Sequence, residues 1–121
     1  MIQELTEDSV AVELLQRLRR ELELGVPPMD KSYKYASVDA SGLYGTGWQF
    51  RLKMYWAKCG EDYLLDLVAL HDGCGYLCSR TIAVGTKDKI LERCDSQDII
   101  DKIVEDMPKI KKSLEESMKD I

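Results

Sequence analysis

The chain has 121 residues, of which 45% are hydrophobic and 32% charged, and its formal net charge is −5. This length supports one hydrophobic core, so we expect a single domain over residues 1–121, and the sequence lacks the apolar run of roughly 18 residues that a transmembrane helix needs. The acidic balance disfavours nucleic acids and anionic membranes as partners, because both attract basic surfaces.

The first expected element is a helix from about Thr6 to Leu24. Thr6 can cap its N-terminus, and the acidic residues that follow suit the positive end of the helix dipole. Gly25 and the two prolines after it end the helix. Apolar side chains recur at helical spacing and form one stripe, which consists of Ala11, Leu14, Leu15, Leu18 and Leu22.

Alternating apolar and polar residues then predict a four-stranded antiparallel meander. The strongest signal covers residues 47–58, where bulky apolar side chains occupy every second position. Strands over residues 63–71 and 76–84 follow it, and turn-forming residues separate them. A weaker strand over residues 33–40 precedes it, and the register of this first strand is open because both of its faces are plausible as the buried one.

Pairing parity predicts which side chains share a face of this sheet. In an antiparallel hairpin, opposed residues lie on the same face and their numbers have a constant sum. Common loop lengths place Trp56 opposite Leu65 and Met54 opposite Leu67. The face assigned to the core contains Trp48, Phe50, Leu52, Met54, Trp56, Leu65, Leu67, Ala69, Tyr76, Cys78, Ile82 and Val84.

The opposite face combines polar side chains, among them Arg51 and Lys53, with large aliphatic ones. A fully solvated face does not need such aliphatic groups, each of which contributes roughly 1.5–3 kcal/mol when it is buried. We therefore expect a segment of the same chain, a second copy or a partner to cover part of this face. The residues assigned to partner binding are Tyr55, Leu64, Val68, Leu70 and Leu77.

The C-terminal third is helical in pattern. Residues 86–94 predict a short helix, and a long helix runs from about Gln97 to Lys119. Its apolar stripe consists of Ile99, Ile103, Met107, Ile110, Leu114 and Met118. Pro108 lies off this stripe, so we expect it to kink the helix without ending it. The elements together predict an α+β fold with an N-terminal helix, a four-stranded antiparallel meander and two C-terminal helices packed on one sheet face.

His71, Cys74 and Cys78 form the sharpest candidate for a chemical site. An imidazole and two thiolates can ligate zinc, with Cys59 or Cys94 as a fourth ligand. The spacing matches no standard zinc motif, so the alternative is a turn beside two packed thiols. The acidic start of the chain lacks the apolar segment of a secretory signal, and we expect reduced cysteines in a cytoplasmic protein.

We find no plausible catalytic set. A cysteine nucleophile could use His71 as its base, with Asp72 to orient the imidazole, but the Asp72 side chain leaves the strand on the other face. The glycines at 42, 45 and 47 precede a strand, whereas a phosphate-binding loop precedes a helix N-terminus. The acidic clusters of the long helix lie off its apolar stripe, as solvated residues do.

These observations favour a small acidic protein-binding module that is not an enzyme and needs no cofactor. Single domains of this kind serve as inhibitors, immunity proteins or chaperone-like adaptors, which is an analogy of class only. We expect a protein partner or a homodimer, since self-association is the commonest way to cover an apolar surface. The alternative function is a zinc or thiol site built on His71, Cys74 and Cys78.

Overall fold

The computed structural model describes residues 5–24, 33–56, 62–73 and 77–119. Its helices and strands follow one another as α1 (Glu7–Leu24), β1 (Tyr33–Asp39), α2 (Ser41–Tyr44), β2 (Trp48–Trp56), β3 (Tyr63–His71), β4 (Leu77–Gly85), α3 (Lys87–Arg93) and α4 (Gln97–Lys119).

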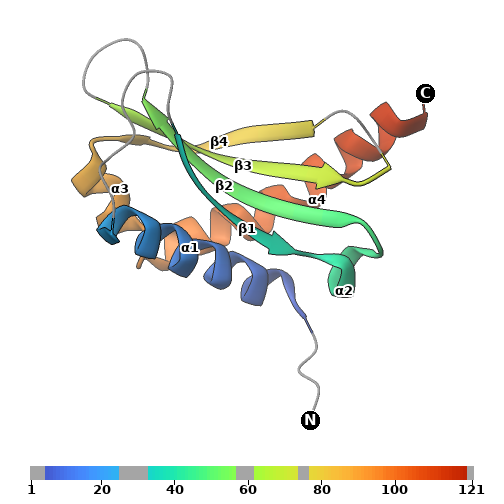
Figure 1. Cartoon of the computed structure of the whole chain (residues 1–121), viewed down its shortest axis with the longest axis horizontal. Coiled ribbons are helices and arrows are strands. Elements are labelled where there is room, and N and C mark those ends of the chain that lie inside the picture. Colours follow the sequence, from blue (N-terminus) through green and yellow to red (C-terminus); the bar gives the residue numbers. More distant parts are fainter. Residues whose placement is uncertain (1–4, 25–32, 57–61, 74–76, 120–121) are drawn as a thin grey trace.

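The four strands form one antiparallel sheet in the order β1-β2-β3-β4, so each strand pairs with its neighbour in the chain. The long helices lie together on one side of this sheet, where α1 packs against β1 and α4 packs against β3, β4 and α1 (Figure 1). The structure therefore confirms the predicted α+β fold with its N-terminal helix, meander and C-terminal helices. Neither α4 nor any other described helix has the length and apolar composition that a membrane span requires.

Side-chain hydroxyls cap the first turns of α1 and α3. The Ser9 backbone N–H donates to Thr6 Oγ1 at 3.1 Å, and the Thr6 N–H donates to Ser9 Oγ at 2.9 Å. At the start of α3, the Lys89 N–H donates to Thr86 Oγ1 at 3.3 Å. These bonds satisfy backbone donors that have no partner within the helix, and the predicted Thr6 cap is confirmed.

The core lies between the sheet and the two long helices. The predicted alternation in β2 is confirmed, because Phe50, Leu52 and Met54 are fully buried. Trp48 is also buried, with 6% of its surface exposed, whereas the side chain of Trp56 lies outside the described part of the structure. The helices contribute their predicted stripes, of which Ala11, Leu14, Leu15, Leu18, Leu22, Ile99, Ile103, Met107, Ile110 and Leu114 are buried. Helix α4 continues through Pro108, as expected.

The pairing of β2 with β3 differs from the predicted register by two residues. Met54 pairs with Leu65 and Trp56 pairs with Tyr63, whereas common loop lengths predicted Met54 opposite Leu67. This last described pair encloses residues 57–62, so the hairpin is centred one residue earlier than predicted. Because the shift is an even number of residues, every side chain keeps its predicted face, and Leu65 and Leu67 are buried.

The prediction that Val84 belongs to the core is wrong, since 56% of its surface is exposed while its neighbour Ala83 is buried. A β-bulge is the physical reason. Asp66 pairs with Thr81, but Leu65 pairs with Ala83, so β4 contains one extra residue at this point. An extra residue inverts the alternation beyond it. Of the remaining residues that were assigned to the core in this strand, Ile82 is buried, Cys78 is partly buried against the core, and Tyr76 lies outside the described residues.

A short helix, α2, occupies part of the glycine-rich connection, for which the sequence predicted no element. The Asp39 carboxylate starts this turn, because its Oδ1 accepts the backbone N–H of Ser41 at 2.9 Å and the Ser41 hydroxyl at 2.6 Å. These bonds lower the pKa of Asp39. The helix brings the Tyr44 ring edge-on to Phe50, with centroids 5.6 Å apart. It therefore closes one end of the core.

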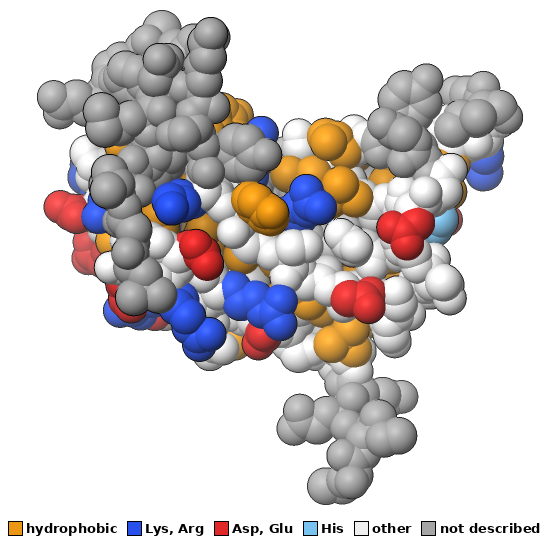
Figure 2. Space-filling view, viewed as in Figure 1, with side chains coloured by type: hydrophobic (Ala, Val, Ile, Leu, Met, Phe, Trp, Pro, Cys, Tyr) orange, Lys and Arg blue, Asp and Glu red, His pale blue; other side chains and the backbone are white. Residues whose placement is uncertain are grey.

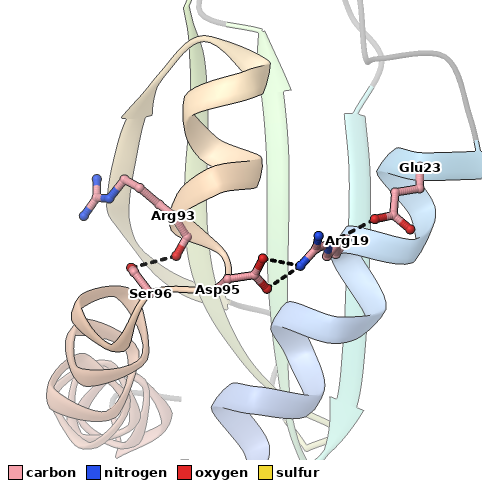
Figure 3. Close-up of polar contacts among 5 residues, drawn as sticks. All are labelled: Arg19, Glu23, Arg93, Asp95 and Ser96. Carbon is pink, nitrogen blue, oxygen red and sulfur yellow. Dashed lines mark hydrogen bonds and ion pairs between the residues drawn. The ribbon is translucent and has the colours of Figure 1, made fainter.

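Arg19 links α1 to the corner between α3 and α4 (Figure 3). Its guanidinium contacts the Asp95 carboxylate, and its Nε lies 3.0 Å from Glu23 within α1. The Ser96 hydroxyl donates to the Arg93 carbonyl and tightens the same corner. Exposed ion pairs of this kind contribute only about 0–1 kcal/mol each, so the apolar core dominates the stability of the fold.

Cys94 lies at this corner and predicts a loss of stability at alkaline pH. Burial, with a smaller effect of the nearby Asp95 carboxylate, raises the pKa of the Cys94 thiol to about 11 from an ordinary value of 9.0. Between these values the unfolded chain releases a proton that the folded chain keeps. We therefore expect the free energy of unfolding to fall by up to about 3 kcal/mol as the pH rises through this interval.

Urea unfolding at a series of pH values measures this effect, and Cys94→Ala is the control. The tyrosines contribute equally to the pH dependence of both proteins, so the difference between the two curves isolates the thiol. Identical curves for the wild type and Cys94→Ala would contradict the prediction.

Candidate functional site on the open face of the sheet

The face of the sheet that points away from α1 and α4 is called the open face here, and no described helix covers it (Figure 1). Strand pairing defines its members, since opposed residues share a face. They are Tyr35, Ser37, Asp39, Gln49, Arg51, Lys53, Tyr55, Leu64, Asp66, Val68, Leu70, Leu77, Ser79, Thr81 and Val84. Figure 2 shows hydrophobic, basic and acidic side chains interspersed over the molecular surface in the same view.

A hollow of about 170 Å³ lies in the middle of the open face. All four strands contribute to its lining, which consists of Tyr35, Arg51, Lys53, Asp66, Val68, Leu70, Leu77 and Ser79. The volume is below the roughly 300–1,000 Å³ that is typical of small-molecule pockets. The hollow can therefore take a side chain or a small ion, but it is too small for a nucleotide or a cofactor of similar size.

Asp66 is the carboxylate in the lining, and hydroxyl groups hold both of its oxygens. The Tyr55 hydroxyl donates to Oδ2 at 3.0 Å, and the Thr81 hydroxyl donates to Oδ1 at 2.8 Å. Burial, and then the hydrogen bond to Asp66, raise the pKa of Tyr55 above its usual value. The three side chains form a fixed polar bridge across β2, β3 and β4.

The two cations of the lining lie over aromatic rings. The Arg51 guanidinium carbon is 5.3 Å from the centre of the Tyr35 ring, and Lys53 Nζ is 5.4 Å from the centre of the Tyr55 ring. Both distances are within the range of cation–π attraction. The Nε of Arg51 is buried and has no hydrogen-bond partner among the described residues. Arg51 is therefore held in position while one of its donors stays unsatisfied.

The structure brings most of the predicted partner-binding residues together. Val68, Leu70 and Leu77 line the hollow. Tyr55 does not line it, but its hydroxyl donates a hydrogen bond to the lining residue Asp66. Leu64 lies on the same face but outside the lining, opposite the exposed Val84. Val68 is only 6% exposed, so its surface is almost wholly covered by its neighbours, whereas Leu77 is 58% exposed.

Tyr35, Arg51 and Lys53 were not among the binding residues predicted from the sequence. Alternation in β2 placed Arg51 and Lys53 on this face, but their proximity to Tyr35 depends on how β1 pairs with β2. Tyr35 pairs directly with Lys53, and Ser37 pairs with Arg51. Because the register of the first strand was open, no signal in the sequence could place the Tyr35 ring beside Arg51.

The predicted zinc site lies partly outside the described residues, since Cys74 and Cys59 are not described. His71 and Cys78 share the core face of the sheet, as the pairing of Ala69 with Cys78 shows. The His71 ring packs edge-on against Trp48 with centroids 5.0 Å apart, and its Nδ1 accepts the Gly73 N–H at 3.0 Å.

This hydrogen bond occupies one of the two imidazole nitrogens that could bind a metal. Within the described part of the chain, no three His, Cys, Asp or Glu side chains form a group that could hold a metal ion. Cys94, a candidate fourth ligand, is buried at the corner between α3 and α4. The zinc site stays a prediction.

No protein-family model, curated protein or solved structure matches this chain. Its structural class is therefore described from its own fold and site. It is a two-layer α+β domain with helices on one face of an antiparallel meander, and the other face carries a small hollow lined by apolar and basic side chains.

Proposed function

We propose that this chain is an acidic protein-binding module that contacts its partner with the open face of the sheet. The observation that carries this proposal is the hollow, which Tyr35, Arg51 and Leu77 all line on a face that no described helix covers. Tyrosine and arginine are enriched at protein interfaces, and exposed aliphatic groups beside them favour the same use. Tyr35 and Leu77 are 47% and 58% exposed.

Features of the edge strands support binding through the face instead of through an edge. Each edge strand has a charged residue on its core side, Lys34 in β1 and Arg80 in β4, as their pairing with Met54 and Leu67 shows. Inward-pointing charges and β-bulges are devices that prevent further strands from pairing, and β4 carries both. Along β1, Arg17 donates to an edge carbonyl at 2.7 Å.

The polar bridge supports binding over catalysis. Both oxygens of Asp66 accept hydroxyl hydrogen bonds, so this carboxylate has a structural role in holding Tyr55 and Thr81, which favours binding over catalysis. In our proposal the module acts as an inhibitor, immunity protein or adaptor in the cytoplasm, and its partner is a different protein or a second copy. Neither catalysis nor a cofactor is part of this function.

Affinity capture from a lysate of the source organism tests the proposal. We expect the wild-type chain to retain a specific protein, or to form a dimer by native mass measurement. The double variant Leu70→Glu/Leu77→Glu should lose this complex by roughly tenfold or more, because it places charges on the contact surface. Val12→Glu is the matched control, since Val12 is an exposed aliphatic residue of α1.

Circular dichroism establishes that each variant is folded. Equal retention by the wild type and the double variant would contradict the use of the open face. A monomeric wild type that retains no protein would contradict the proposed function as a whole.

A further inference from the structure

The buried Nε of Arg51 lacks an acceptor within the described structure. A buried donor without an acceptor costs free energy, and native proteins keep few of them. The ring of Tyr35, at 5.3 Å, holds the guanidinium in place. Arg51 is therefore a positioned cation in the lining of the hollow.

The charges of the lining indicate the sign of that acceptor. Arg51 and Lys53 supply two positive charges, and Asp66 supplies one negative charge whose oxygens already accept the hydroxyls of Tyr55 and Thr81. The described residues of the lining therefore carry a net positive charge, on a chain whose net charge is −5. An anion fits this hollow better than a cation or a neutral group.

The size and the walls of the hollow indicate the kind of anion. A volume of about 170 Å³ admits a side chain, and Leu70 and Leu77 offer apolar surface for methylene groups. Guanidinium groups bind carboxylates through paired, charge-assisted hydrogen bonds that are stronger beside apolar surface. We propose that the hollow receives an aspartate or glutamate side chain of the protein partner and that Arg51 binds its carboxylate. This inference rests on the proposed function.

Nuclear magnetic resonance titration of the full chain tests this inference with a defined probe, N-acetylglutamate N-methylamide. We expect the Arg51 Nε–H signal and the backbone amides of Val68 and Leu70 to shift, and the glutamine analogue of the probe to leave them unchanged. In Arg51→Met the affinity for the probe should fall by roughly tenfold or more. Arg20→Met is the matched control, because Arg20 is an exposed arginine of α1.

Three titration results would overturn the inference. The first is the absence of a shift with the glutamate probe, and the second is an equal shift with the glutamine analogue. The third is stronger binding of inorganic phosphate than of the glutamate probe, since this would identify a site for small free anions. Unchanged affinity in Arg51→Met would also exclude Arg51 as the binding group.

Thermal melting distinguishes a binding role of Arg51 from a structural one. If Arg51 serves binding, Arg51→Met should melt at or above the temperature of the wild type, because it removes an unsatisfied buried donor. A lower melting temperature would identify Arg51 as a structural residue and overturn the inference. Affinity capture separates the two proposals: if Arg51→Met retains the partner while Leu70→Glu/Leu77→Glu loses it, the proposed function stands and the carboxylate site does not.

Discussion

Replacement of Ala83 by aspartate is expected to lower the free energy of unfolding by more than about 3 kcal/mol. Ala83 is 5% exposed and faces the core, opposite Leu65. A carboxylate there would lie between the sheet and the helices, where apolar groups surround it. Urea unfolding followed by circular dichroism measures the change.

Val84→Asp is the matched control for this experiment, because Val84 is the next residue along the strand and is 56% exposed. We expect its effect to remain within about 0.5 kcal/mol. The pair of variants tests the β-bulge directly. Without the bulge Val84 would face the core, and Val84→Asp would then be the more destabilising variant. A larger loss for Val84→Asp than for Ala83→Asp would contradict the structure of β4.

The second large effect is expected for Phe50→Ala, which should lower the free energy of unfolding by about 3–5 kcal/mol. Phe50 is fully buried in β2, between Val38 and Ala69 on the neighbouring strands. Its ring also contacts Tyr44 edge-on. Truncation would leave a cavity and detach α2 from the core.

Chemical denaturation measures this loss, and Leu77→Ala provides a comparison with an apolar side chain that is 58% exposed. We expect less than about 1 kcal/mol for Leu77→Ala. Domains of this size are stable by about 5–15 kcal/mol, so Phe50→Ala should remove a third or more of the total in a chain near the middle of that range. Comparable losses for the two variants would show that Phe50 is not at the centre of the core.

Under the proposed function, the open face and the edge strands together define how this domain associates. Inward-pointing charges at Lys34 and Arg80 disfavour growth of the sheet at either edge. The broad face offers tyrosine, arginine and leucine side chains around a hollow that a partner can fill. A positive hollow on an acidic surface also favours one orientation of a charged partner over others.

Arg80 shows how an edge charge can be accommodated beside the core. Its guanidinium lies 3.7 Å from the buried carboxylate of Asp106 in α4, and Lys102 Nζ lies 3.4 Å from the same group. The two cations are partly exposed, so they reach Asp106 from the solvent side. The buried acid in turn keeps Arg80 on the side of the sheet away from the open face.

Local periodicity was sufficient to predict most of the architecture. Alternation of apolar side chains in β2 correctly identified Phe50, Leu52 and Met54 as buried residues, and helical spacing did the same for Ile103 and Met107 in α4. The faces of β2 and β3 were also predicted correctly although the register differed by two residues, because parity survives an even shift. These properties depend on backbone geometry that neighbouring residues share.

The tertiary structure alone decided the bulge in β4 and the composition of the hollow. No residue type between Thr81 and Val84 marks an extra position, since the bulge arises from how β4 pairs with β3 and packs on the helices. The Tyr35 ring lies over Arg51 because β1 pairs with β2 in one particular register, which neither strand specifies by itself. Lateral pairing joins residues that are distant in the chain, so the amino-acid pattern determined which face was open and the assembled sheet determined which side chains meet there.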